Sequence, residues 1–124
     1  MKPEQVLRGT WRITATENRR RKALGARQPA RIAFGPRNRG SLRLLSVDCK
    51  LDCRCGEREG HPSVAFSFAG TDQGDTVSGR GVAAVVDGRL HGHLFFHLGG
   101  ECSFAAERVA ARRPRRLPAR RKGR

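Results

Sequence analysis

Three adjacent runs of alternating residues decide the fold of this chain. They read SVAFSFAG at residues 63–70, VSGRGVAAVVDG at residues 77–88 and RLHGHLFFH at residues 89–97. In the first run Val64, Phe66 and Phe68 recur at every second position, and a period of two places them on one face of a strand. Asp87-Gly88 follows the second run and is a strong signal for a two-residue hairpin turn. The segment therefore predicts a meander of antiparallel strands.

The rest of the chain carries the same kind of pattern in shorter pieces. In all, eight strands are expected, at residues 6–17, 29–34, 41–47, 48–55, 63–70, 76–86, 89–98 and 102–107. Turns rich in glycine and charged residues separate them, and a helical periodicity is nearly absent. This predicts an all-β fold, a small eight-stranded antiparallel up-and-down barrel, because closure protects the strand edges of a small domain. An open coiled sheet or a two-sheet sandwich is the alternative.

Length and composition predict one domain and a soluble setting. The chain has 124 residues, which we divide into a barrel domain at 1–109 and a disordered Arg/Pro-rich tail at 110–124. It contains no apolar run near the roughly 20 residues that span a bilayer, so no membrane partner is expected. The first residues lack the apolar core of a signal peptide, which predicts the cytoplasm. There the four cysteines would be free thiols or metal ligands.

The net charge of +15 is unevenly distributed and suggests a polyanionic partner. Residues 108–124 hold nine cations and no acidic residue, while residues 1–107 carry a net charge of +6. Such a tail attracts nucleic acid without sequence specificity, although the arginine-rich composition could equally reflect coding bias. The candidate nucleic-acid residues are Arg19, Arg20, Arg21, Lys22, Arg112, Arg113, Arg115 and Arg116. The barrel itself is not expected to contribute, because most aromatic residues have core parity.

A short motif at the two ends of the barrel resembles the signature of lipocalin and avidin type barrels, the calycins. Gly9-Thr10-Trp11 opens the first strand, and Arg108 follows the last one. In those families a Gly-x-Trp opens the first strand, and a basic residue from the end of the barrel lies over the indole. The resemblance therefore implies that Arg108 stacks on Trp11 and helps to close one end of the barrel.

A longer series of motifs resembles a family of short uncharacterised bacterial proteins. It comprises DCR at residues 52–54, GxPxVxFSFxGxD at 60–72, GD at 74–75, SGRGxA at 78–83 and GxLFFHxG at 92–99. The resemblance implies no activity, because none is assigned to that family. This chain departs from the pattern in three places: Phe68 is more often Trp, Gly100 is usually Asp, and residues 18–26 are basic instead of acidic.

Two groups of polar residues are candidates for chemistry. His91 and His93 share one face of a strand, as Cys53 and Cys55 do of another, and zinc accepts both ligand types. The two strands are not neighbours in a meander and the spacings are not those of zinc fingers, so no metal is predicted. The second group is a polar cluster of Arg80, His97, Asp72 and Asp75. Its simpler interpretation is that Arg80 pairs with a turn aspartate and fixes the loop.

The sequence predicts a binding module without enzymatic activity. It contains no nucleophile motif, no phosphate-binding loop and no paired carboxylates in apolar surroundings. The first candidate ligand is a small apolar molecule inside the barrel, and the alternative is a nucleic acid bound nonspecifically by the basic loop and tail. No cofactor is predicted. Candidate interior residues are Trp11, Phe34, Phe66, Phe68, Phe96 and Phe104, with Arg108 at the end. The pattern does not decide whether the interior is open or filled.

Overall fold

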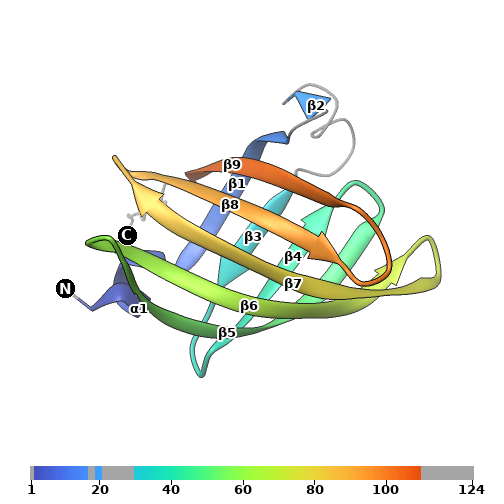
Figure 1. The fold of residues 1–124 in the computed structure, drawn as a ribbon, viewed down its shortest axis with the longest axis horizontal. Helices are drawn as coiled ribbons and strands as arrows, with labels where there is room; N and C mark the ends of the chain where they lie inside the picture. Colours follow the sequence, from blue (N-terminus) through green and yellow to red (C-terminus); the bar gives the residue numbers. More distant parts are fainter. Residues whose placement is uncertain (1, 17–18, 21–29, 110–124) are drawn as a thin grey trace, which may run out of the picture.

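The computed structural model describes residues 2–16, 19–20 and 30–109 of the chain. It contains one closed antiparallel β-barrel with a short helix at one end (Figure 1). The prediction of an eight-stranded antiparallel barrel is therefore confirmed. The predicted tail at 110–124 and most of the predicted loop at 18–28 lie outside the described residues.

The elements follow one another in simple order along the chain. They are α1 (Pro3–Leu7), β1 (Gly9–Thr16), β2 (Arg19–Arg20), β3 (Arg31–Phe34), β4 (Arg39–Leu44), β5 (Val47–Arg58), β6 (His61–Asp72), β7 (Asp75–Val86), β8 (Arg89–Phe96) and β9 (Glu101–Arg108). In the part of the chain that is described, no helix is long and apolar enough to cross a membrane.

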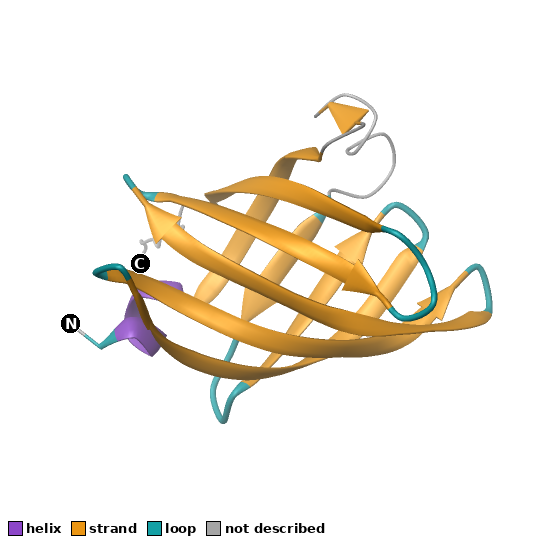
Figure 2. Cartoon of the chain, viewed as in Figure 1, coloured by secondary structure: helices purple, strands orange, loops and turns teal. Residues whose placement is uncertain are grey.

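The barrel closes because the first long strand pairs with the last. β1 is hydrogen-bonded to β3 on one side and to β9 on the other, with Trp11 opposite Arg108. From β3 to β9 each strand pairs with the next in sequence, so eight strands form the wall and β2 is a two-residue extension paired with β1. Figure 2 shows strands making up nearly all of the described chain. Closure leaves the wall without a free edge along most of its length.

Alternation of side chains produces the core, as the pattern predicted. Along β5 buried and exposed residues alternate from Val47 to Arg54, and the same rhythm runs through β6. The buried members all point into the barrel and form one apolar cluster. No polar or charged residue is buried in the described part of the chain. The interior is therefore a single hydrophobic core with all charges on its outer surface.

The observed boundaries correct the predicted ones in several places. Residues 3–7 form α1, whereas the sequence placed residues 6 and 7 in the first strand; Pro3 suits the first turn of a helix because it needs no N–H donor there. Arg19–Arg20 form β2 within the predicted loop, and the third strand does not reach Val47, which starts β5. β8 ends at Phe96, short of the predicted residue 98.

Two hairpins are longer and tighter than predicted. β5 and β6 continue through the charged segment 56–62 and meet at a two-residue turn, Glu59-Gly60, where both residues have positive φ. Gln73-Gly74 forms the same kind of turn between β6 and β7, as Asp87-Gly88 does between β7 and β8. Two consecutive positive φ values match the twist of the flanking strands. These residues are therefore turn centres, and the polar residues beside them belong to strands.

Candidate functional site

The barrel interior is filled by aromatic rings that lie over glycines of neighbouring strands. The predicted interior residues are deeply buried except Phe96, which is half-buried against the core. A Cβ atom on Gly79 would lie 2.5 Å from the Phe68 ring, and one on Gly81 would lie 2.4 Å from the Phe66 ring. The ring thus occupies the volume that the missing side chain leaves free, as expected for a core packed at crystal-like density.

A third phenylalanine ring also lies over a glycine of the neighbouring strand, and the rings contact one another. A Cβ on Gly92 would lie 2.4 Å from the ring of Phe104. Phe68 and Phe96 meet edge to face, with ring centroids 5.3 Å apart. An apolar ligand in this space would have to displace rings that are in contact with backbone. This part of the interior therefore has the geometry of a packed core.

One end of the barrel is closed by Trp11, Arg108 and α1. The Trp11 indole Nε1 donates a hydrogen bond to the Leu7 carbonyl at 2.9 Å, and the Arg108 guanidinium lies 4.1 Å from the ring centroid. Arg108 also donates to the carbonyls of Arg8, at 2.9 Å, and Val6. The stacking that the sequence motif implied is confirmed. It ties the end of α1 to the last strand, so this end is a structural closure.

Gly9 has a positive φ of 117° in the same closure. A Cβ on it would lie 3.2 Å from Arg108 Nη1. Both the backbone conformation and the close approach of the guanidinium favour glycine here. Gly-x-Trp and the distant arginine are thus one physical unit.

The buried thiols are chemically quiet. Burial raises the pKa of Cys53 from its ordinary value of 9.0 to about 11, with the neighbouring Cys55 and Asp52 adding to the effect. Burial likewise raises the pKa of Cys49 and of Cys55. All four cysteines are free thiols. Since the thiolate is the reactive form, Cys49, Cys53 and Cys55 act as small apolar residues at neutral pH.

The stability of the protein should therefore fall as the pH rises from about 9 to about 11. Above pH 9.0 the unfolded chain releases the Cys53 proton, while the folded chain retains it up to a pKa of about 11. The unfolded state is then stabilised relative to the folded state, by about 3 kcal/mol at full effect. Urea unfolding across this pH range measures the change, with Cys53→Ala as the comparison. An equal pH slope in both proteins would contradict the assignment.

The histidine and cysteine pairs are not brought together. His91 and His93 point outward from β8, whereas Cys53 points inward from β5 and is buried. Strands β6 and β7 separate the two pairs along the wall. Among the described residues no group of three or more His, Cys, Asp or Glu side chains is arranged to hold a metal ion. His93 instead lies 3.0 Å from Glu101 and stacks on Phe95, with ring centroids 4.6 Å apart.

The proposed polar cluster is spread along the barrel. Asp72 and Asp75 face each other beside the β6–β7 turn, while Arg80 lies five residues further along β7, about 16 Å away by strand geometry. His97 follows β8, and its backbone N–H donates to the Ser78 carbonyl at 2.8 Å. Asp72 accepts a hydrogen bond from Ser46 of the neighbouring turn. Thus the structure gives Asp72 a serine partner where the sequence suggested Arg80.

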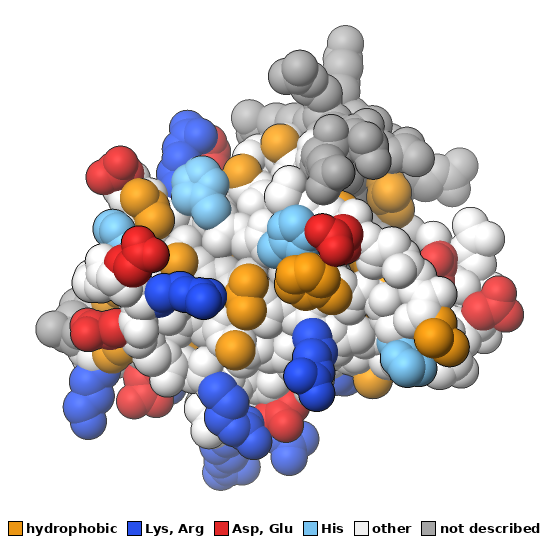
Figure 3. All heavy atoms as spheres, in the orientation of Figure 1, with side chains coloured by type: hydrophobic (Ala, Val, Ile, Leu, Met, Phe, Trp, Pro, Cys, Tyr) orange, Lys and Arg blue, Asp and Glu red, His pale blue; other side chains and the backbone are white. Residues whose placement is uncertain are grey.

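The outer face of β5–β9 carries charges of both signs around an apolar centre (Figure 3). A shallow hollow of about 390 Å³ lies over this face, and its outward side chains include Ala65, Val82 and Ala84. Phe95 stands nearby and is 45% exposed. Arg89 pairs with Glu107 at 3.1 Å. Further acidic residues on the strands and turns of this face are Glu57, Glu59, Asp87 and Glu101. Cations on this face are thus largely balanced by neighbouring acidic residues.

The outer face of β1, β3, β4 and β5 is instead strongly basic. Arg12, Arg31 and Arg43 lie directly opposite one another on three adjacent strands and form a row of like charges. Beyond it the outward residues Thr10, Ala33 and Ser41 form the floor of an open groove of about 1440 Å³. We call this the basic groove.

The far side of the basic groove is also cationic. Its lining there includes Arg37, Arg39 and Arg54, and Lys50 closes the β5 end of the floor. Across this face seven cations stand beside two acidic residues, Asp48 and Asp52. This face has a net charge of +5, whereas the other residues up to residue 107 whose side chains are described sum to −3. Among the described residues up to residue 107, the positive charge is therefore concentrated on one face.

Sequence reasoning missed the basic groove. Arg12, Arg31 and Arg43 each have the outward parity of a strand, which is visible in the sequence. Their alignment depends on the pairing register of β1, β3 and β4, which the sequence did not show. The structure does not test the cations that the sequence predicted as nucleic-acid contacts. Only the backbone of Arg19 and Arg20 is described, and the others lie outside the described residues: Arg21, Lys22, Arg112, Arg113, Arg115 and Arg116.

No family model, curated protein or solved structure matches this chain. The resemblance to a family of short bacterial proteins thus stays a prediction, and so does the relation to calycin barrels beyond the shared Trp–Arg geometry. The class that the structure defines is a small closed antiparallel β-barrel with a filled interior and one basic outer face.

Proposed function

We propose that this protein is a non-enzymatic binding module that holds a polyanion on the outer surface of its barrel. The observation that carries the proposal is the row formed by Arg12, Arg31 and Arg43. Like charges directly opposite each other destabilise a sheet. Glu107 lies opposite Arg12 and Asp48 lies opposite Arg43. The repulsion is therefore concentrated at Arg31, whose two cross-strand neighbours are both cations. A polyanion that neutralises the row relieves this repulsion and releases its own counterions.

The proposal departs from the first sequence-based candidate, an apolar ligand inside the barrel. The contact of the Phe66, Phe68 and Phe104 rings with glycine backbone weighs against that ligand. The proposal keeps the polyanionic partner that the sequence suggested. It adds the outer surface of the barrel to the basic loop and tail as a binding surface. It also keeps the cytoplasm as the setting, since free thiols persist in a reducing compartment.

Binding of the full chain to polyanions and to an apolar fluorescent probe tests the proposal. We expect duplex DNA and polyphosphate to bind at low salt and to be released as the salt concentration rises. The apolar probe should not bind. Absence of any polyanion binding at low salt, or tight binding of the probe without salt dependence, would overturn the proposal.

The contribution of the tail is measured separately. Deletion of residues 112–124 removes eight cations and should weaken binding. We expect a salt-dependent fraction of the affinity to remain in the shortened protein, because the barrel keeps its basic face. Complete loss of binding would assign the function to the tail alone.

A further inference from the structure

We propose that the basic groove is the binding site and that it holds the sugar–phosphate backbone of a nucleic acid duplex. This inference rests on the proposed function and narrows it to one ligand and one set of residues. The site is defined by described residues of the barrel wall and its turns. The argument depends on the shape of the groove, its charge, and the chemistry of its lining.

The groove has two cationic sides and a floor of small residues. Arg12 and Arg31 border the groove without lining it, and on β1 and β3 the floor residues Thr10 and Ala33 lie two positions further along the strands. Arg39 lies two positions beyond the floor residue Ser41 on β4. The two sides are therefore four residues apart, about 13 Å by strand geometry. Long arginine side chains from both sides can reach a phosphate chain that lies on the small floor.

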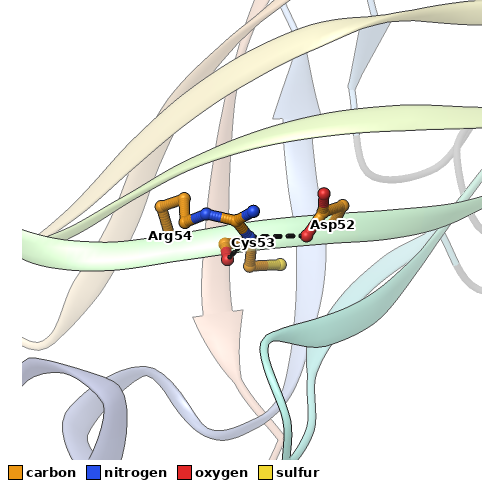
Figure 4. Close-up of polar contacts among 3 residues, drawn as sticks. All are labelled: Asp52, Cys53 and Arg54. Atoms are coloured by element: carbon orange, nitrogen blue, oxygen red, sulfur yellow. Dashed lines mark hydrogen bonds and ion pairs between the residues drawn. The ribbon is translucent and has the colours of Figure 1, made fainter.

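The acidic residues of this face are already engaged. Asp48 pairs with Arg43 at 3.2 Å, and Asp52 pairs with Arg54 at 2.6 Å. Arg54 also donates to the Cys53 carbonyl at 2.8 Å, so its guanidinium lies along β5 (Figure 4). Five cations of the face are outside these two pairs: Arg12, Arg31, Arg37, Arg39 and Lys50. Two of them, Arg31 and Arg39, are exposed on opposite sides of the floor.

The lining chemistry favours phosphate over other anions and a duplex over a single strand. A guanidinium presents a planar fork that matches two phosphate oxygens. Single-strand binders add aromatic rings on which bases stack, but the aromatic residue in the lining, Phe34, is 5% exposed and points inward. Among the described residues the exposed large apolar side chains are Leu45, Phe95 and Leu98, none of which lines the groove. A duplex keeps its bases stacked internally and has the higher charge density.

The test compares two charge-neutralised double variants of the full chain. Arg31→Gln with Arg39→Gln removes one cation from each side of the groove. Arg58→Gln with Arg80→Gln removes two exposed cations from the β5–β9 face and is the matched control. Affinity for a short duplex DNA is measured by fluorescence anisotropy from about 50 mM to about 200 mM salt. Thermal unfolding followed by circular dichroism verifies that both variants are folded.

We expect the groove variant to bind the duplex roughly 100-fold more weakly at about 50 mM salt. The slope of log K against log salt should become less steep by about 1.8, since each duplex phosphate contact contributes about 0.9. The control should change the affinity less than about threefold, and a single strand of equal length should bind more weakly than the duplex.

Three results would overturn the groove assignment. Equal losses in the two variants would show that the charge acts without a defined site. Polyglutamate binding as tightly as the duplex would indicate an acidic protein partner. An unchanged slope in the groove variant, with wild-type binding intact, would place the site elsewhere and leave the proposed function standing. Absence of binding by the wild-type chain would instead overturn the proposed function itself.

Discussion

Replacement of Trp11 by alanine is expected to lower the free energy of unfolding by about 3–5 kcal/mol. Trp11 is 1% exposed and packs in the core at the end where β1 meets β9. The substitution leaves a large cavity, leaves the Leu7 carbonyl without its indole donor, and removes the surface on which Arg108 stacks. A domain of this size has a total stability of about 5–15 kcal/mol. The expected loss is therefore a large fraction of the total free energy of unfolding.

Urea unfolding followed by circular dichroism measures this effect, because the substitution removes the single tryptophan of the chain. Trp11→Phe is the informative control. It retains an aromatic ring for packing and stacking but has no N–H donor for the Leu7 carbonyl. We expect it to cost about 1–3 kcal/mol. If alanine and phenylalanine destabilise equally, the ring is not the anchor of the closure.

Replacement of Gly70 by alanine is expected to cost about 3 kcal/mol, at the upper end for overpacking. A Cβ at this position would lie 2.0 Å from the Asp48 carbonyl oxygen and 2.7 Å from the Cys49 Cα. Both atoms belong to the backbone of the paired strand, so a rotamer change cannot make room. The β5–β6 pairing itself would have to move apart at this point.

Gly56→Ala is the matched control for this prediction. Gly56 lies on the partner strand β5 opposite Ser63, and a Cβ there would meet nothing within 4 Å. We expect a change within about 0.5 kcal/mol, or a slight gain from the reduced freedom of the unfolded chain. The difference between the two variants isolates the close backbone approach from the general effect of replacing a strand glycine. Similar unfolding energies for both would refute the packing argument.

Parity of side chains is the part of the fold that the sequence predicted best. The inward set on β6 and the Asp87-Gly88 hairpin were identified correctly, because a strand repeats every two residues and a turn has its own residue types. Strand ends were predicted less well. Segment 56–62 looks like a loop in sequence, since it is charged and contains glycine and proline, yet its residues pair across a two-residue turn.

For the candidate site, the sequence predicted which way side chains face but not which residues they contact. The interior residues were named correctly as inward-facing, but composition could not show that Gly79, Gly81 and Gly92 lie under phenylalanine rings. Likewise, four polar residues near one another in sequence were grouped as a cluster, and the structure distributes them along β6, β7 and the end of β8. Both outcomes depend on contacts between strands, which periodicity within a single strand does not encode.

The sequence by itself determined that this chain forms an antiparallel barrel with an apolar inside, because alternation is a local property of each strand. It also determined the Trp11–Arg108 contact, through a motif at the two ends of the barrel. The tertiary structure alone decided that Arg12, Arg31 and Arg43 form one row and that the cations of the described residues concentrate on one face. The reason is physical: a shift of register by one residue turns every side chain of a strand to the other face, so the neighbours of a residue are set by pairing across the whole sheet.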